Sequence, residues 1–371
     1  MRVIILGGGL MGTSTAFFLA RRGVKVQLIE RGFVGAGATV ASFGNIRRSG
    51  RALCQLPLAR RSLDLWGRLQ DLLGQDVEFR ATGHLRLVFD AEGAADLATY
   101  AAAAQPHGLQ LEQLTAAELH RRFPGLGPDA LGASFSPQDG SANPRLVSPA
   151  FASAAARLGA EIETQAGEVQ ITRNRQGFEV ACARGRFQGD VLVNCAGAWG
   201  TAIARHFGEA VPLEIHGPQM GVTEPLPYRI LPVVGMWARD GGAYFRQVER
   251  GNIVFGGGVS RVPVPDSGHA RYDPAGLARQ LAPLLRLCPA LADVAIIRHW
   301  SGSEGYVADM LPVMGASATT PGLFHAFGFC GHGFQLGPGV GAVMAELIAT
   351  GTTETPIGAM AIHRFANGAT P

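Results

Sequence analysis

The chain has 371 residues, of which 47% are hydrophobic, 16% are charged and 51 are glycine. This length and apolar content allow a large buried core and favour two domains, and they exclude an intrinsically disordered chain. The formal net charge is only +3 and no run of Lys or Arg exceeds two residues, which argues against a nucleic-acid surface. So much glycine without a collagen-like repeat indicates many tight turns, or backbone lying close to a ligand.

Residue usage also restricts the chemistry. Lys25 is the only lysine, and it falls in a Gly-Val-Lys-Val hairpin that we expect to face solvent, so a lysine Schiff base is excluded. The five cysteines are odd in number and lack Cys-x-x-Cys spacing, so we expect neither a disulfide framework nor a metal site. Glycine-rich sequence follows the N-terminus directly and no run of 18 apolar residues exists. We therefore expect no signal peptide, no transmembrane span and a cytoplasmic protein.

The first 30 residues predict a strand, a turn, a helix and a second strand. The apolar run Val3 to Leu6 suits a strand buried on both faces, Met11 to Arg22 is helical up to Gly23, and Val24 to Glu30 forms the second strand. An amphipathic helix follows from Leu56 to Leu73, where leucines and a tryptophan recur at a spacing of three to four residues.

The middle of the chain mixes both element types. Leu85 to Val88 alternates like a strand, an alanine-rich helix follows, and the capping box Thr115 to Glu118 opens another helix. A helix is expected from Pro144 to Gly159, and short strands over residues 160 to 195.

The last third indicates a second sheet. Residues 213 to 300 read as antiparallel strands with one helix around residues 275 to 287. Residues 323 to 350 return to a strand, a glycine-rich turn and a helix. The chain therefore weaves between two domains, and no single linker divides it.

The sequence Gly7-Gly-Gly9-Leu-Met-Gly12 matches the dinucleotide-binding pattern G-x-G-x-x-G in its expected place, between a strand and a helix. Gly7 allows the tight turn, Gly9 lets a pyrophosphate approach the backbone, and Gly12 allows helix and strand to pack closely. Glu30, at the end of the second strand, is placed to bind an adenosine ribose and would repel a 2′-phosphate, which disfavours NADP. The motif alone does not separate NAD from FAD. Its position at the start of the chain, and the buried strand that returns before Ala196-Gly197, favour FAD.

Several motifs together resemble the D-amino-acid-oxidase-like flavoprotein superfamily, over nearly the whole chain. They are Gly7 to Gly12, Glu30 to Gly32, Gly37 to Thr39, Gly44-Asn45, Asp139-Gly140, Asn143-Pro144, Asn194 to Trp199, Trp300 to Gly302 and Phe329 to Gly333. Within the superfamily the chain is most similar to β subunits of heteromeric amine dehydrogenases: opine oxidase, D-hydroxyproline dehydrogenase and hydrogen cyanide synthase. Trp300 to Tyr306, Leu311 to Gly315 and Phe327 to Gly341 carry that finer likeness, with Thr223 to Pro227 and Tyr244 to Gln247.

The resemblance implies an α/β (α+β) fold, with a Rossmann-like FAD-binding domain interwoven with a substrate domain on a mostly antiparallel sheet. The implied FAD-binding segments are residues 1–80, 141–212 and 301–371, and the substrate-binding segments are residues 81–140 and 213–300. Glycines cluster around residues 7–12, 35–44 and 328–341, where the backbone is expected to lie against FAD. The implied reaction oxidises the C–N bond of a secondary amine or D-amino acid, such as D-hydroxyproline, a proline-like compound or an opine, by hydride transfer to flavin N5.

The resemblance also implies partners. The chain would be the catalytic β subunit of a heteromer with an NAD/flavin α subunit and a small ferredoxin-like subunit, and a second flavin, FMN, would lie at a subunit interface. Two alternatives stay open: a self-sufficient oxidase of the glycine or sarcosine oxidase kind that produces hydrogen peroxide, and a flavin-carrying electron-transfer subunit.

The sequence departs from the superfamily at three points. The segment Ser303 to Asp309 has no cysteine, so we expect FAD to be noncovalent. Lys25 is not placed to activate oxygen over the flavin, which favours a dehydrogenase. Glycine oxidases carry an arginine that clamps the substrate carboxylate where this chain has the turn Gly302-Ser-Glu304-Gly305, so the carboxylate must be bound elsewhere or the substrate presents a cation there.

Candidate site residues follow from these motifs. For substrate and catalysis they are His332, Glu304, Tyr306, Tyr244, Arg246 and Arg48. For FAD they are Gly7, Gly9, Leu10, Met11, Gly12, Glu30, Arg31, Gly37, Ala38, Thr39, Gly44, Asn45, Ile46, Val169, Ala196, Gly197, Trp199, Gly302, Gly331, His332, Gly333, Phe334 and Gln335. Arg246 and Arg48 are candidate carboxylate clamps because a guanidinium matches a carboxylate bidentately, although Arg246 could equally be an exposed strand arginine. Glu304 could bind an amine or be a surface acid, and His332 could merely fill its turn.

Overall fold

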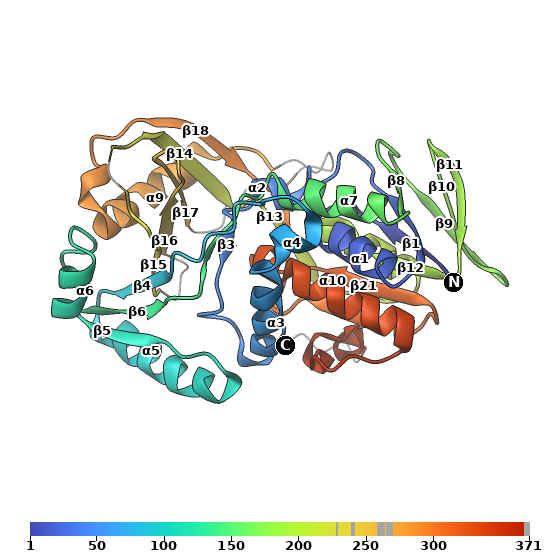
Figure 1. Ribbon diagram of the computed structural model, residues 1–371, viewed down its shortest axis with the longest axis horizontal. Coiled ribbons are helices and arrows are strands. Elements are labelled where there is room, and N and C mark those ends of the chain that lie inside the picture. The colour runs from blue at the N-terminus through green and yellow to red at the C-terminus, as the bar shows by residue number, and fades with distance from the viewer. Residues whose placement is uncertain (228, 239–241, 258–263, 265–269, 367–371) are drawn as a thin grey trace.

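The computed structural model of the chain describes residues 1–227, 229–238, 242–257, 264 and 270–366. They form two lobes that lie side by side (Figure 1), each built on its own large sheet. The mixed α/β class and the pairing of a parallel with a mostly antiparallel sheet confirm the fold class expected from the sequence.

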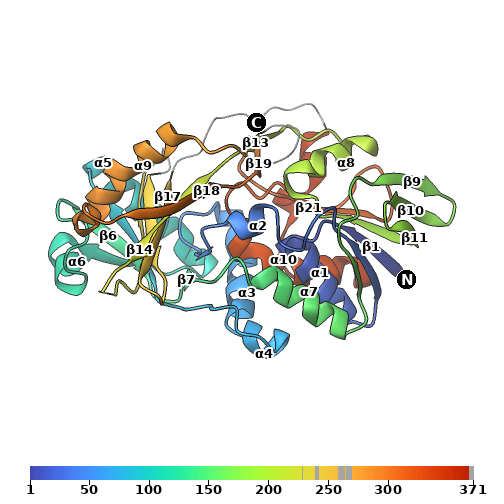
Figure 2. The same ribbon diagram turned by 90° about the horizontal axis from the view of Figure 1, so that it is seen from above.

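The first lobe contains a six-stranded sheet in the order β20-β21-β12-β1-β2-β8, parallel except for β20. Its strands are β1 (Arg2–Leu6), β2 (Lys25–Ile29), β8 (Glu161–Glu163), β12 (Val191–Asn194), β20 (Val313–Ala316) and β21 (Leu323–Phe327). The helices packed on one face are α1 (Leu10–Ala20), α3 (Leu56–Trp66), α7 (Val147–Arg157) and α10 (Gly333–Thr350). The other face carries α8 (Gly200–His206) and the small sheet of β9 (Gln170–Asn174), β10 (Gly177–Cys182) and β11 (Gly185–Gly189). This small sheet lies at the far end of the lobe in Figure 2.

Glycines along α10 let this helix approach its neighbours closely. A Cβ at Gly337 would lie 2.3 Å from the Leu10 side chain, and one at Gly341 would lie 2.5 Å from Ser14. The Ser14 hydroxyl donates to the Gly337 carbonyl at 2.9 Å, which links the two helices directly. The expectation that the glycines of residues 328–341 lie against the flavin is therefore wrong for Gly337, Gly339 and Gly341, because they serve helix packing.

The second lobe contains an eight-stranded sheet in the order β18-β14-β17-β16-β15-β4-β6-β5, in which only β15 and β4 are parallel. Its strands are β4 (His84–Val88), β5 (Glu112–Thr115), β6 (Gly132–Ser136), β14 (Gln219–Pro225), β15 (Val233–Met236), β16 (Ala243–Gln247), β17 (Asn252–Gly257) and β18 (Ile296–Ser301). The helices of this lobe are α5 (Ala91–Ala104), α6 (Ala116–Arg122) and α9 (Pro274–Leu287). The predicted capping box opens α6, since the Thr115 hydroxyl accepts from the Glu118 N–H and the Glu118 carboxylate accepts from the Thr115 N–H.

Two small sheets and one short helix join the lobes. They are β3 (Asn45–Ile46) with β7 (Gly140–Ser141), β13 (Leu213–His216) with β19 (Glu304–Val307), and α2 (Ala38–Ala41). The short helix α4 (Leu69–Leu73) packs in the core of the first lobe. The helix predicted from Leu56 to Leu73 is therefore two helices, since α3 ends before Gly67 and α4 starts after Arg68.

Two local expectations need correction. Lys25 is exposed, as expected, but it begins β2, which is parallel to β1, so it does not lie in a hairpin. Val169 lies just before β9, outside any strand, and packs partly buried against the second face of the six-stranded sheet. None of the helices in the described part of the chain has the length and apolar character to span a membrane.

Candidate functional site

The turn between β1 and α1 is shaped by its glycines. Gly7 has φ +107°, and a Cβ there would lie 2.4 Å from the Cys195 carbonyl oxygen. A Cβ at Gly12 would lie 1.9 Å from the Gly7 carbonyl oxygen, so only glycine lets α1 pack this closely on the turn. A Cβ at Gly9 would meet only the Thr39 hydroxyl, at 3.5 Å. The backbone of Gly9 is thus open at the N-terminus of α1, where N–H groups and the helix dipole favour an anion.

Glu30 lies where β2 ends, beside this turn. Its carboxylate accepts hydrogen bonds from the Gly8 N–H at 2.6 Å and the Gly32 N–H at 2.7 Å. The next residue, Arg31, stacks its guanidinium 3.7 Å from the centre of the Trp199 ring. Trp199 follows the Ala196-Gly197 turn after β12, so these predicted cofactor residues do meet at the carboxyl end of the parallel strands. That edge is where α/β sheets bind nucleotides.

The segment Gly37 to Ile46 runs past the same place. The Thr39 hydroxyl accepts the Leu10 N–H at 3.0 Å, which ties α2 to the first turn of α1. A Cβ at Gly302 would lie 2.8 Å from that of Ala41, so the turn after β18 also lies against α2.

Two further members of this segment reach into the lobe junction. Gly44, at φ +83°, leaves room for the Ala142 carbonyl oxygen, which would lie 2.4 Å from a Cβ. Asn45 contacts His84 through Nδ2 and Nε2 at 3.3 Å. Ile46 is fully buried in the core of the first lobe, so only its backbone could meet a cofactor.

The N-terminus of α10 lies beside that of α1, since a Cβ at Gly333 would be 3.0 Å from Met11 Cε. The first turn, Gly333 to Gln335, presents N–H groups that have no partner within the helix. Phe334 packs its ring 5.4 Å from that of Trp66. The Gln335 amide donates to the Ala59 carbonyl at 2.8 Å, so its side chain faces α3 and only its backbone could meet a cofactor.

These elements fit FAD. Two helix N-termini, an open glycine backbone and a carboxylate for a ribose gather at one edge of the parallel sheet. Val169 lies before β9 on the other face of the sheet, and its contact with FAD remains a prediction.

The turn before α10 is already engaged by Glu304. The Gly331 N–H donates to the Glu304 carboxylate at 2.7 Å, and the Tyr306 hydroxyl lies 3.4 Å from its other oxygen. Desolvation raises the pKa of Glu304, and the Gly331 hydrogen bond opposes this shift. Desolvation and the charge of Glu304 raise the pKa of Tyr306. A carboxylate with a raised pKa can accept a proton from a substrate ammonium group.

Tyr244 and Arg246 share the face of β16 opposite the fully buried Phe245, as their alternation predicts. The Tyr244 ring packs 4.7 Å from that of Phe43. The Arg246 Nε donates to the Phe43 carbonyl at 2.8 Å, and its guanidinium lies 5.6 Å from the Phe43 ring. Arg246 therefore steadies the backbone before Gly44 and also lines a polar hollow at the lobe junction.

Arg48 is held by protein groups. Its Nε lies 3.2 Å from a carboxylate oxygen of Asp139, and its Nη2 donates to Gln138 at 3.0 Å. Asp139 is fully buried and also accepts the Arg48 backbone N–H, at 2.9 Å. This guanidinium is occupied as a structural ion pair, so it is less suited to clamp a substrate than the arginines around it.

Three arginines that the sequence did not single out as site residues gather nearby, namely Arg47, Arg51 and Arg86. They affect His332, whose pKa is lowered well below its usual value by desolvation first and then by these three charges, so its imidazole is neutral. In the sequence, the pattern of the strand around residue 86 could have indicated that Arg86 belongs to a polar site. There the apolar Leu85 and Leu87 alternate with His84 and Arg86, which leaves two titratable side chains on one face.

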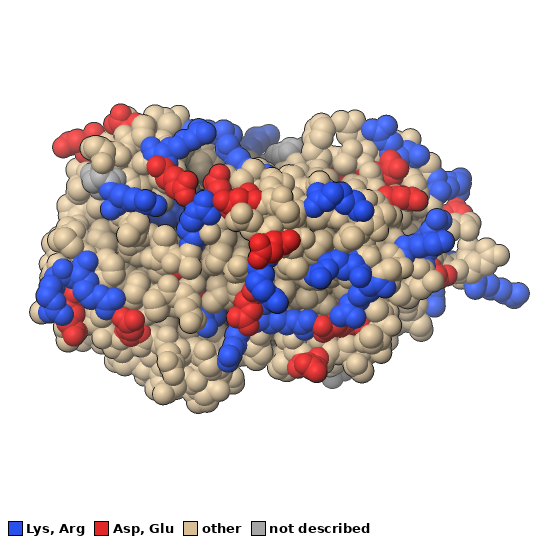
Figure 3. Space-filling model, in the orientation of Figure 1, with Lys and Arg blue, Asp and Glu red and all other residues tan. Residues whose placement is uncertain are grey.

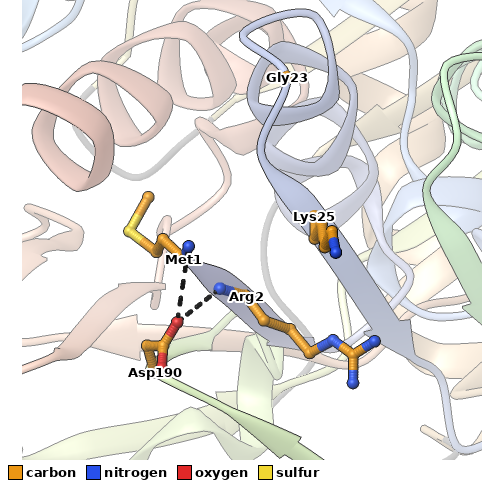
Figure 4. A pocket seen from close by; sticks show the side chains of 5 residues that line it. All are labelled: Met1, Arg2, Gly23, Lys25 and Asp190. Carbon is orange, nitrogen blue, oxygen red and sulfur yellow. Dashed lines mark hydrogen bonds and ion pairs between the residues drawn. The ribbon is translucent and has the colours of Figure 1, made fainter.

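A hollow at the opposite end of the six-stranded sheet is lined by Met1, Arg2, Gly23, Lys25 and Asp190 (Figure 4). Asp190 accepts the Arg2 N–H at 2.7 Å and lies 3.8 Å from the terminal amine. Because this is the amino end of β1, it is the wrong edge of the sheet for a nucleotide.

On the face shown in Figure 3, basic side chains are dispersed, with acidic ones among them.

Comparison with known proteins agrees with this geometry. A family model described as FAD dependent oxidoreductase (DAO) matches residues 2–347. The chain is 28% identical to 4-methylaminobutanoate oxidase (formaldehyde-forming) of Paenarthrobacter nicotinovorans over 98% of the chain and 46% of that protein, so it spans about half of that relative. It is 26% identical to an opine oxidase subunit of Rhizobium meliloti, over 97% and 96% of the two chains. The crystal structure of L-proline dehydrogenase from P. horikoshii superimposes with a TM-score of 0.93 at 28% identity, over 100% and 99% of the chains.

Proposed function

Because the chain belongs to the DAO family of FAD-dependent oxidoreductases, we propose that it oxidises the C–N bond of a secondary amine or a D-amino acid. One observation carries the proposal: the N-termini of α1 and α10 lie next to each other, and Glu304 and Tyr306 lie at the turn before α10. A site suited to a nucleotide therefore adjoins a site suited to an amine. Opine, proline-like and hydroxyproline substrates all belong to this class, and relatives are named for amine, opine and proline substrates.

Under this proposal the β1–α1 turn, Glu30 and the first turn of α10 hold the cofactor. The chemistry that bound FAD supplies is acceptance of the hydride from the carbon next to the nitrogen. That C–H bond breaks with its electron pair, the N–H proton leaves, and an imine forms that water then hydrolyses. The reaction needs the amine in its neutral form, and the raised pKa of Glu304 suits this carboxylate to take the proton. The other task of the protein is to position the C–H bond and exclude water.

We assign residues 1–80, 141–212 and 301–371 to FAD binding and residues 81–140 and 213–300 to substrate binding. In support, every strand of the six-stranded sheet lies in the first set of segments. The strands of the eight-stranded sheet lie in the second set, apart from the last residue of β18. Residues 367–371 of the final segment lie outside the described part of the chain.

We further propose a dehydrogenase that passes electrons to partner subunits, an NAD/flavin α subunit and a small ferredoxin-like subunit, with FMN at an interface. Lys25 supports this, because the sole lysine begins β2 at the amino end of the sheet, away from the proposed flavin site. The likeness to a protein named as one subunit of an opine oxidase supports a heteromer. A self-sufficient oxidase is the second candidate, favoured by the likeness to 4-methylaminobutanoate oxidase.

The test is anaerobic mixing of the purified protein with candidate amines while the flavin absorption is followed. Bleaching of the flavin by a secondary amine or a D-amino acid supports the proposal. A protein that lacks a flavin spectrum, or whose FAD is reduced by none of these amines, contradicts it. Peroxide formed in air by this chain alone would select the oxidase, whereas bleaching that is not reversed by air would select the dehydrogenase.

A further inference from the structure

A buried histidine of the first lobe, outside the proposed site, has polar partners at both nitrogens of its ring. His325 lies on β21 and is fully buried. Its Nε2 lies 2.9 Å from a carboxylate oxygen of Glu209, and its Nδ1 lies 3.2 Å from Nδ2 of Asn194. Asn194 is the last residue of β12 and pairs directly with His325 across the sheet. The histidine therefore contacts the carboxyl end of a strand, at the edge where FAD is proposed to bind.

The Asn194 side chain holds the turn that follows β12 at both of its ends. Its Oδ1 accepts the Ala196 N–H at 3.3 Å, and its Nδ2 donates to the Gly200 carbonyl at 2.8 Å. Gly197 and Trp199, two of the predicted FAD residues, lie between these contacts. A Cβ at Gly197 would meet nothing within 4 Å, so packing at this residue does not confine the turn. The shape of the turn therefore depends on how Asn194 is oriented.

These contacts also decide which nitrogen of His325 carries a proton. A carbonyl oxygen can only accept, so the amide nitrogen of Asn194 faces Gly200 and directs its second N–H to His325 Nδ1. The Ala196 N–H requires the amide oxygen on its side and so fixes the same orientation. His325 Nδ1 is therefore an unprotonated acceptor, and the ring proton lies on Nε2.

Glu209, in the loop after α8, fixes this form of the ring. Its buried carboxylate accepts from His325 Nε2, from the Ser317 hydroxyl at 2.7 Å and from the Ala318 N–H at 2.7 Å. Desolvation raises the pKa of Glu209, but these hydrogen bonds outweigh it and hold the pKa below its ordinary value. The ionised carboxylate keeps the proton on Nε2. A second proton, on Nδ1, would place two N–H donors of His325 and Asn194 against each other.

A network of this kind serves geometry more than stability. Buried polar groups with all their partners stabilise a fold little more than apolar side chains of the same volume, but they allow only one arrangement. The arrangement selected here is the Asn194 orientation that ties the start of the turn to its end.

We propose that His325 is a positioning residue of the FAD site, which holds Asn194 in the orientation that gives the turn from Ala196 to Gly200 its FAD-binding shape. His325 acts from behind the turn and does not touch FAD. A turn that already has this shape does not have to be ordered when FAD binds, so its order adds to the affinity. The inference rests on the proposed function, because it takes FAD to lie at this turn.

Two substitutions of His325 separate its contact with Asn194 from its contact with Glu209. In His325→Asn the side-chain oxygen takes the position of Nδ1 and still accepts from Asn194, but the side chain is too short to reach Glu209. In His325→Gln the amide nitrogen reaches the position of Nε2 and still donates to Glu209, but the acceptor for Asn194 is lost. Equilibrium dialysis of the FAD-loaded protein measures the dissociation constant of FAD for each variant.

We expect His325→Gln to weaken FAD binding about tenfold, because the Asn194 N–H loses its partner and the turn is in its binding shape for less of the time. His325→Asn stays within about threefold of the unsubstituted protein, although it leaves a cavity and melts at a lower temperature than His325→Gln does. A merely structural histidine would show the reverse, with weaker FAD binding in the less stable variant. Equal binding by the two variants, or tighter binding by His325→Gln, would overturn the proposal.

A double-substitution cycle tests whether His325 acts through Asn194. If it does, His325→Gln weakens FAD binding no further once Asn194→Ala is present, whereas losses that add in the double variant would overturn the proposal. The matched control is His120→Gln on α6 of the other lobe, where a ring nitrogen lies 3.0 Å from the Gly127 carbonyl oxygen, and it leaves FAD binding unchanged. Should Asn194→Ala fail to fold, the comparison of the two variants of His325 decides without it.

Nitrogen NMR of protein that carries isotope-labelled histidine gives a readout independent of FAD. The signals of His325, identified by their absence from His325→Gln, show a proton on Nε2 and none on Nδ1. A proton on Nδ1 would overturn the proposal, because that nitrogen could not accept from Asn194. If the unsubstituted protein shows the expected ring form but binds no FAD, the proposed function fails and takes the inference with it. If it binds FAD and both variants of His325 bind FAD equally well, the inference fails while the proposed function stands.

Discussion

Replacing Gly9 or Gly12 by alanine distinguishes the role of the β1–α1 turn in folding from its role in cofactor binding. At Gly12 the added Cβ would lie 1.9 Å from the Gly7 carbonyl oxygen, a backbone atom that can move only if the turn opens. At Gly9 the same atom would meet only the Thr39 hydroxyl at 3.5 Å, an ordinary contact. Gly9 also has φ −71° and ψ −175°, which alanine adopts freely. The two substitutions therefore differ in what they disturb.

The expected magnitudes differ accordingly. Gly12→Ala forces overpacking between strand and helix, which costs about 3 kcal/mol and lowers the melting temperature by about 5 °C or more. Gly9→Ala changes the stability of the cofactor-free protein by less than about 1 kcal/mol. Its methyl group would stand between the α1 N-terminus and the proposed pyrophosphate site. Loss of a hydrogen bond to a charged group, about 1.5–3 kcal/mol, then weakens FAD binding about tenfold to a hundredfold.

The assay is thermal unfolding of both variants without cofactor, followed by titration of each with FAD. Gly358→Ala is the matched control, because this exposed glycine has no positive φ and a Cβ there meets nothing within 4 Å. We expect it to change stability as little as Gly9→Ala does. If Gly9→Ala binds FAD as tightly as the unsubstituted protein, the pyrophosphate does not lie at this turn and the cofactor site is wrongly placed.

Three further predictions concern named carboxylates. Glu30→Ala weakens FAD retention about tenfold, measured as flavin content after dialysis, and unchanged retention would contradict its role at the ribose. The hydrogen bond from Arg61 holds the pKa of Glu346 below its ordinary value of 4.5, so this pair stabilises the fold above that pH and less as pH falls through the lowered pKa. Arg61→Met therefore reduces the free energy of unfolding by about 1 kcal/mol at pH 7 and by less at pH 3 in urea titrations, and equal losses would refute the ion pair. Arg48→Met leaves Asp139 buried without its cation and costs about 3–5 kcal/mol in the same assay, whereas a loss below about 1 kcal/mol would show that the pair is not structural.

The parts of the site that could be predicted from sequence are those whose chemistry is local. The spacing of Gly7 and Gly12 is visible in the chain, because the turn needs φ +107° at Gly7 and Gly12 packs against the Gly7 carbonyl oxygen. That Gly7 also makes room for the Cys195 carbonyl oxygen could not be seen in the sequence. Glu30 ends the next strand, and parallel pairing of β1 with β2 brings it back to the turn. The prediction failed for the glycines of α10 because a glycine that admits a neighbouring helix and one that admits a ligand look the same in sequence.

The roles of the arginines were harder to predict, because only the three-dimensional structure shows which guanidinium group is neutralised by a carboxylate. Arg48 and Arg47 are adjacent in the chain and equally suited to a carboxylate, and only a residue 91 positions away, Asp139, decides which of them is neutralised. Arg86 joins the cluster because β4 pairs with β15 and β6 in the other lobe, a pairing that no local pattern specifies. The alternation on β4 shows that one face is polar, but not what lies opposite. A buried cluster that has no counter-ion among the described residues can thus be recognised only once the fold is known.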